Sequence, residues 1–191
     1  TLNLQKDSFL GQPFPSGGNS LIYDMGKQNT TTGNGNATDA FLSGSYLQID
    51  GNITGTGGLT KVGLDMILLN GANTYDGATI IRNGVLQIGR NDSLPTGTDL
   101  VVNGSAGMFD LNGFNQEVAS LAGGGGSVNN GAFDYNTLTV NQGSDTNYGG
   151  TLDGNVILAK SGGGTLTLLS GNSRRGGTVV RGGTLMLGGS A

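Results

Sequence analysis

Apolar and polar residues alternate over short stretches along most of the chain. In the stretch 85–88, Val-Leu-Gln-Ile, the alternation places Leu86 and Ile88 on one face of a strand and Gln87 on the other. Such stretches end in Asn-Gly or other glycine-containing turns, which recur about every 8 to 12 residues. No window has the period of an amphipathic helix. The pattern predicts an all-β chain of short strands.

One group of strands occurs twice. Residues 61–89 (KVGLDMILLNGANTYDGATIIRNGVLQIG) return without a gap at 160–188 (KSGGGTLTLLSGNSRRGGTVVRGGTLMLG), at a constant offset of 99 residues. In the second copy the alternation places Leu185 and Leu187 inside. A repeat that cannot bury its apolar side alone must stack on its neighbours. The repetition therefore predicts a solenoid.

Three short strands with corners make one coil of a parallel β-helix. With about 20 to 25 residues per coil, the repeat offset corresponds to about four or five coils. At ~4.8 Å per coil the whole chain would form a rod of about 40 Å. We predict this β-helix over residues 46–191. Residues 1–45, which hold the polar run 28–38, are expected to form irregular N-terminal coils, a cap or the end of an upstream domain, with an exposed loop from Asn29 to Asn36.

Composition supports the solenoid and excludes several classes of function. Gly supplies 39 of the 191 residues, well above the usual ~7%, as expected for a chain with many positive-φ corners. The absence of Cys excludes disulfides and zinc–thiolate sites and is compatible with secretion. Charged residues are sparse, the net charge is −4, and Arg174–Arg175 is the only basic cluster, so no nucleic-acid partner is expected. The chain starts at Thr1 without a leader, which suggests a piece of a larger protein.

The chemistry available to this chain is limited. Without His or Cys, Ser-His-Asp triads, Cys-His dyads and histidine metal sites are impossible within it. Glycoside hydrolysis needs two carboxyl groups ~5 to 9 Å apart, and the nearest candidate pairs are Asp92 with Asp99 and Asp145 with Asp153. An Asp that caps its own turn backbone is the simpler interpretation of each. We predict no catalytic, cofactor-binding or metal-binding residues and no enzyme activity for this chain.

Two sets of residues are candidates for ligand binding. The recurring cations Lys61/Lys160 and Arg82/Arg181 could form a binding stripe, but charges on an exposed strand face or solenoid end that limit aggregation are the favoured reading. The tyrosines could form a sugar-stacking platform, but scattered surface or corner positions are favoured; they are Tyr23, Tyr46, Tyr75, Tyr135 and Tyr148. A calcium β-roll is not supported, because its nonapeptide repeat is missing.

The stretches 57–63, 68–79 and 83–86 resemble the passenger-associated β-strand repeat of bacterial autotransporters, the type V secreted proteins of Gram-negative bacteria. Residues 110–123 are similar to the linker that commonly joins such repeats, and the second copy departs from the pattern at 172–175. The resemblance covers about residues 46 to 191. It implies a right-handed parallel β-helix that forms the stalk of a passenger.

The same resemblance implies a function, a location and partners. We expect a non-catalytic stem that promotes secretion and folding across the outer membrane and displays an N-terminal functional region at the cell surface. The implied partners are the protein's own outer-membrane β-barrel translocator and an upstream passenger domain; a host surface or polysaccharide is a further candidate. Two alternatives stay open. The parent could be a secreted serine protease or esterase whose catalytic residues lie outside this chain, or the β-helix could itself be an adhesin surface, with Asn29 to Asn36 as the contact.

Overall fold

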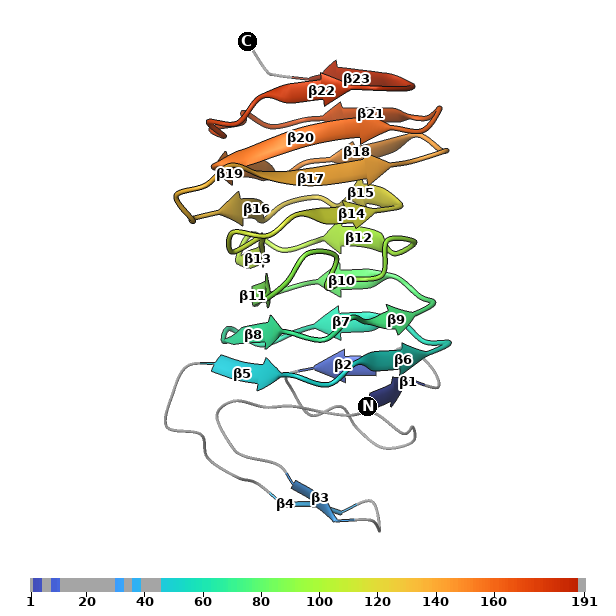
Figure 1. The fold of residues 1–191 in the computed structure, drawn as a ribbon, viewed down its shortest axis with the longest axis vertical. Helices are drawn as coiled ribbons and strands as arrows, with labels where there is room; N and C mark the ends of the chain where they lie inside the picture. Colours follow the sequence, from blue (N-terminus) through green and yellow to red (C-terminus); the bar gives the residue numbers. More distant parts are fainter. Residues whose placement is uncertain (1, 5–7, 11–29, 33–35, 39–45, 189–191) are drawn as a thin grey trace.

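The chain folds into a stack of short strands (Figure 1). The structure, a computed structural model, describes residues 2–4, 8–10, 30–32, 36–38 and 46–188. Within these residues it contains 23 strands and no helix. Accordingly, the described residues include no helix that could cross a membrane.

The strands line three faces of a solenoid. The first face is one six-stranded parallel sheet of β5 (Tyr46–Ile49), β8 (Met66–Leu69), β11 (Gly84–Ile88), β13 (Gly107–Asp110), β16 (Ser127–Asn130) and β19 (Thr151–Gly154). The second face has two sheets, separated by one coil without a strand: β1 (Leu2–Leu4), β6 (Ile53–Gly55) and β9 (Thr74–Tyr75), then β14 (Gln116–Val118), β17 (Asn136–Asn141), β20 (Val156–Ser161) and β22 (Thr178–Val180).

The third face also has two parts, which a parallel bridge between Gly123 and Tyr148 joins. Its strands are β2 (Ser8–Leu10), β7 (Leu59–Lys61), β10 (Thr79–Ile81), β12 (Asp99–Val102) and β15 (Ser120–Ala122), followed by β18 (Thr146–Tyr148), β21 (Thr165–Leu168) and β23 (Thr184–Leu187). The chain visits the three faces in this order, once per coil, for about seven turns. The predicted parallel β-helix is confirmed.

The register sets the length of each coil. Ile67 pairs with Leu86, 19 residues later, and Val128 pairs with Leu152, 24 residues later. These values bracket the described coils and lie close to the predicted 20 to 25 residues. The variation comes from the corners, because strand pairing continues unchanged while the connecting loops differ in length.

The core consists of columns of inward side chains that repeat once per coil. On the first face one column joins register partners that are all buried: Ile67, Leu86, Phe109, Val128 and Leu152. Burying each such side chain contributes ~1.5–3 kcal/mol to folding. The predicted inside positions of Leu86 and Ile88 are confirmed, and Gln87 faces outward.

The last coil departs from this prediction. Leu185 packs against the core but is only partly buried, and Leu187, predicted to be inside, is 72% exposed. The prediction for Leu187 is wrong because no later coil of the described chain covers it. Its counterpart Ile88 lies under the following coils and is fully buried.

The two repeats occupy different faces. In the first copy β7 and β10 lie on the third face and β8 and β11 on the first; in the second copy β20 and β22 lie on the second face and β21 and β23 on the third. The 99-residue offset therefore spans four and two-thirds turns, between the four and five predicted. The same sequence pattern thus fits more than one side of the solenoid.

The described residues before Tyr46 belong to two groups. β1 and β2 pair in parallel with β6 and β7, so they add to the first coil. The strands β3 (Thr30–Thr32) and β4 (Asn36–Thr38) form an antiparallel hairpin. The loop expected from Asn29 to Asn36 falls on this hairpin, with residues 29 and 33–35 outside the described residues. The assignment of residues 1–45 to opening coils, a cap or an upstream domain stays a prediction.

Candidate functional site

The recurring lysines lie inside the solenoid. Lys61 is 1% exposed, and its ammonium donates to three backbone carbonyl oxygens: Val62 (3.0 Å) and Gly63 (2.7 Å) in its own corner, and Asn83 (3.1 Å) in the next coil. A buried ammonium is tolerated only when its donors are satisfied. This lysine therefore fastens two neighbouring corners together.

Lys160 repeats this arrangement atom for atom. Its ammonium donates to the carbonyl oxygens of Ser161 (2.5 Å), Gly162 (3.0 Å) and Gly182 (3.3 Å), the counterparts of the three acceptors around Lys61. Burial lowers the pKa of Lys160, and it lowers the pKa of Lys61 to about 8 against the opposing charge of Asp65. Both sequence readings placed these lysines on the surface and are wrong, because their side chains turn inward at the corner.

The recurring arginines do not form a stripe. Arg82 and Arg181 are both exposed, but Arg82 follows β10 on the third face and Arg181 follows β22 on the second. Side chains on different faces cannot line one track along the solenoid. The predicted cation stripe is therefore wrong for both pairs.

The four candidate carboxylates each bond to the following coil. Asp92 accepts from the Glu117 backbone N–H (2.9 Å), Asp99 from the Ser120 hydroxyl (2.6 Å), Asp145 from the Thr165 backbone N–H (2.7 Å), and Asp153 from the Ser173 hydroxyl. The expectation that each would cap its own turn is thus corrected, since the partner lies 20 to 25 residues away. These oxygens connect coils.

The tyrosines do not form one platform. Tyr75 and Tyr148 are buried, whereas Tyr135 is 56% exposed. Burial raises the pKa of both Tyr75 and Tyr148 well above the usual range. Tyr23 and the side chain of Tyr46 lie outside the described part of the chain.

The corner at Tyr75 has a counterpart of different chemistry in the second repeat. The Tyr75 hydroxyl hydrogen-bonds the Thr79 hydroxyl, and at the equivalent positions the Arg174 guanidinium donates to the Thr178 hydroxyl. The Arg174 Nε is buried without a partner, and burial lowers the pKa of this arginine. The departure from the repeat pattern thus keeps one hydrogen bond and exchanges an aromatic ring for a cation.

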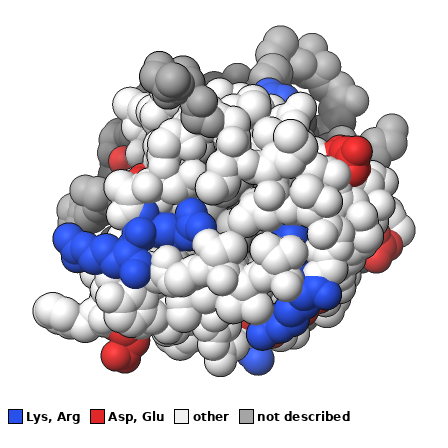
Figure 2. All heavy atoms as spheres, turned by 90° about the horizontal axis from the view of Figure 1, so that it is seen from above, with Lys and Arg blue, Asp and Glu red and all other residues white. Residues whose placement is uncertain are grey.

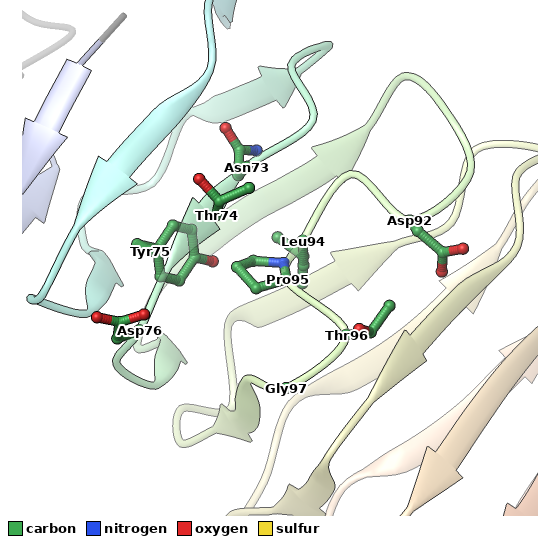
Figure 3. A pocket seen from close by; sticks show the side chains of 9 residues that line it. All are labelled: Asn73, Thr74, Tyr75, Asp76, Asp92, Leu94, Pro95, Thr96 and Gly97. Carbon is green, nitrogen blue, oxygen red and sulfur yellow. The ribbon is translucent and has the colours of Figure 1, made fainter.

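A hollow of about 510 Å³ lies where the second face lacks a strand, between β9 and β14 (Figure 3). Here the coil follows an irregular path through residues 91–98. Figure 3 shows Asp76 at one end and Asp92 at the other, with Tyr75 and Pro95 between them. The full lining is Asn73, Thr74, Tyr75, Asp76, Asp92, Leu94, Pro95, Thr96 and Gly97.

Buried amides hold this irregular segment from both sides. The Asn73 side chain accepts from the Ile53 backbone N–H (2.7 Å) and donates to the Ser93 carbonyl oxygen (2.7 Å), which links three coils. Gln116 accepts from the Leu94 backbone N–H (2.9 Å) and donates to the Leu94 carbonyl oxygen (3.0 Å). The sequence analysis assigned no role to either amide, although the recurrence of Asn73 at Asn172 was a usable signal.

The C-terminal end of the stack is apolar and open. Seen from this end, the surface is mostly uncharged, with separate groups of basic side chains (Figure 2). The exposed apolar residues of the last two strands are Val179, Val180, Met186 and Leu187. A second hollow of about 400 Å³ opens here beside Arg174 and Leu187.

Comparison with known proteins agrees with the repeat. The passenger-associated-transport-repeat family matches the chain twice, at residues 59–88 and 158–187. The chain is 33% identical over 181 residues to the adhesin BmaC autotransporter of Brucella suis biovar 1 (strain 1330), which covers 91% of this chain and 5% of that protein. The chain is part of an autotransporter passenger. The predicted resemblance is confirmed.

The passenger segment has a second relative with a different printed activity. It is 28% identical over 185 residues to the serine protease EspC of Escherichia coli O127:H6 (strain E2348/69 / EPEC), covering 83% of the segment and 14% of that protein. No solved structure is a significant match. The passenger segment therefore spans only a small part of either relative's length.

This relationship also gives the location of the passenger segment. Autotransporters are secreted or displayed through the outer membrane of Gram-negative bacteria, so the segment lies at the cell surface or outside the cell. The relationship also implies a translocator barrel as a partner within the parent protein.

Proposed function

We propose that this passenger segment is a non-catalytic stem that promotes folding and secretion of its parent and displays a functional region on its N-terminal side. The observation that carries this proposal is how the polar side chains are used. The buried ammonium groups of Lys61 and Lys160 and the carboxylates of Asp92, Asp99 and Asp145 all bond to an adjacent coil. Groups that could serve chemistry elsewhere serve stacking here.

Stacking of this kind can drive export. In a solenoid each coil contacts only its neighbours, so folding can start in one coil and propagate to the next. A coil that docks on a finished one gains strand pairing, buried side chains and bonds such as Asn115 Oδ1 accepting from the Thr137 backbone N–H (2.8 Å). Folding outside the cell therefore supplies free energy at each step without a nucleotide.

Deletion of the segment tests the proposal. Residues 46–191 are removed from the full-length parent, and both the amount that reaches the surface and the activity of the exported material are measured. We expect export to collapse while the escaped material keeps its activity. This result is also expected if the parent is a protease like EspC, whose catalytic residues would lie elsewhere. Normal export with loss of activity would overturn the stem role.

A matched pair of substitutions on β21 separates folding from mere presence of the segment. Leu166 is buried, and its neighbour Thr167 faces outward. In the parent, Leu166→Asp places an unpaired charge in the core and should reduce secretion, whereas Thr167→Asp should not. Equal secretion of the two variants would show that coil folding does not drive export.

An adhesin surface is the second candidate function, favoured by one loop. Phe133 is fully exposed, and its loop is held by Asn130, which donates to the Asp134 carbonyl oxygen (2.9 Å), and by Asn155, which donates to the Ala132 carbonyl oxygen (2.8 Å). An exposed aromatic side chain on a fixed loop is typical of a binding anchor. Phe133→Ser should reduce adhesion of bacteria displaying the parent to cultured mammalian cells if the loop is a contact, and unchanged adhesion would dismiss it.

A further inference from the structure

We propose that the hollow between β9 and β14 binds a neutral oligosaccharide. The proposal does not depend on the stem role, because it concerns a surface of the passenger segment and not its folding. The hollow measures about 510 Å³, within the ~300–1,000 Å³ usual for ligand pockets. It lies at the one described coil of the second face that contributes no strand.

The groups that reach the hollow suit hydroxyl-rich ligands. Asp76 and Asp92 are exposed at its two ends and offer carboxylate acceptors, and Thr74 and Thr96 offer exposed hydroxyls. A carboxylate oxygen accepts strong hydrogen bonds from hydroxyl groups. Pro95, half buried between the two ends, provides a small apolar surface. A sugar chain presents hydroxyls along its edges and C–H groups on its faces, and it matches this order.

The charge of the hollow excludes other ligand classes. Its lining contains two carboxylates and no Lys or Arg, so phosphates, sulfates and uronic acids are repelled. Tyr75 and Leu94 are buried, so an apolar ligand finds little surface. The described residues include no group of three carboxylate, His or Cys side chains that could hold a metal ion.

The hollow is also rigid before any ligand arrives. The Thr79 hydroxyl, bonded to Tyr75, also bonds the Thr98 hydroxyl (2.9 Å), which donates to the Gly77 carbonyl oxygen (3.0 Å). Asp92 is fixed by its own N–H, which donates to the Asn115 carbonyl oxygen (2.9 Å). A prearranged surface loses less entropy on binding.

The second repeat provides a natural contrast. Its equivalent corner carries Arg174 and Arg175 in place of Tyr75 and Asp76. The acidic lining is therefore specific to the first copy and is not required by the repeat itself. Binding should map to the first repeat alone.

Titration calorimetry of the purified chain with chitotetraose, cellotetraose and mannotetraose tests the proposal, with tetragalacturonate as the anionic comparison. Gly97 lines the hollow, and a Cβ there would meet no atom within 4 Å, so Gly97→Phe fills the hollow without displacing backbone. Gly143 has the same free space outside the hollow, and Gly143→Phe is the matched control.

We expect at least one neutral tetrasaccharide to bind, tetragalacturonate not to bind, and Gly97→Phe but not Gly143→Phe to abolish binding. Asp76→Asn should weaken binding about tenfold or more, as expected for loss of a hydrogen bond to a charged group, and Asp134→Asn, on the distant loop, should not. The proposal is overturned if no neutral tetrasaccharide binds, if Gly97→Phe binds as well as the unsubstituted chain, or if tetragalacturonate or a basic tetrapeptide binds in place of the neutral sugars.

Discussion

The ammonium groups of Lys61 and Lys160 explain why a lysine and particular glycines recur together. Each ammonium needs three carbonyl oxygens turned toward it, and the neighbouring Gly84 and Gly183 have φ values of 66° and 65°. A Cβ at Gly84 would lie 2.5 Å from the Gly63 carbonyl oxygen and 2.6 Å from the Lys61 Nζ. Only glycine leaves room for the ammonium in this corner.

Loss of the ammonium should destabilise the corner. Lys61→Met keeps most of the buried volume but leaves the carbonyl oxygens of Val62, Gly63 and Asn83 without a donor. We expect a loss of ~1–3 kcal/mol in the free energy of unfolding, measured by urea denaturation. Arg90→Met, at an exposed position, should change little. A Lys61→Met variant as stable as the unsubstituted chain would show that these bonds only offset the cost of burying the charge.

The same lysine predicts a pH dependence. Its pKa is lowered to about 8 in the folded chain, so between that pH and the unfolded value near ~10.4 the unfolded chain binds a proton that the folded chain does not. Stability should therefore rise as pH increases from 8 toward 10. Above that range it should fall, because burial raises the pKa values of Tyr75 and Tyr148. Thermal unfolding across this range checks the rise, and Lys61→Met should flatten it.

At the scale of the strand, the sequence was informative wherever the cause is local. The inside positions of Leu86 and Ile88 follow from alternation alone, because neighbouring side chains in a strand point to opposite faces. The alternation could not reveal that Lys61 turns inward, since its acceptor Asn83 belongs to the next coil. Likewise, the hollow depends on how residues 91–98 leave the second face, which no repeat pattern encodes.

Equivalent strands should respond differently to the same substitution. Leu86 on β11 is fully buried, and its counterpart Leu185 on β23 is only partly buried at the open end. Leu86→Asp should cost ~3–5 kcal/mol or more, because it combines lost burial with an unpaired charge. Leu185→Asp should cost much less. Circular dichroism during heating compares the two, and equal losses would show that the last coil is as well packed as the second.

At the scale of the whole molecule, the open end should promote self-association. Val180 and Leu187 are 50% and 72% exposed on the last coil, and unpaired strand edges beside apolar side chains favour edge-to-edge contact. We expect concentration-dependent oligomers of the chain in sedimentation velocity. Val180→Lys with Leu187→Lys should leave monomers, whereas Leu64→Lys, at an exposed corner, should not. Oligomers that persist in the double variant would place the contact elsewhere.

The offset of four and two-thirds turns between the repeats has a consequence for multivalent binding. If further copies follow at the same spacing, each presents its corner one-third of a revolution away from the last. A receptor lying along one side would then meet the same corner only at every third copy, roughly 14 coils or ~67 Å along the axis at ~4.8 Å per coil. Avidity requires simultaneous contacts, so a partner that gains from several copies must wrap around the shaft.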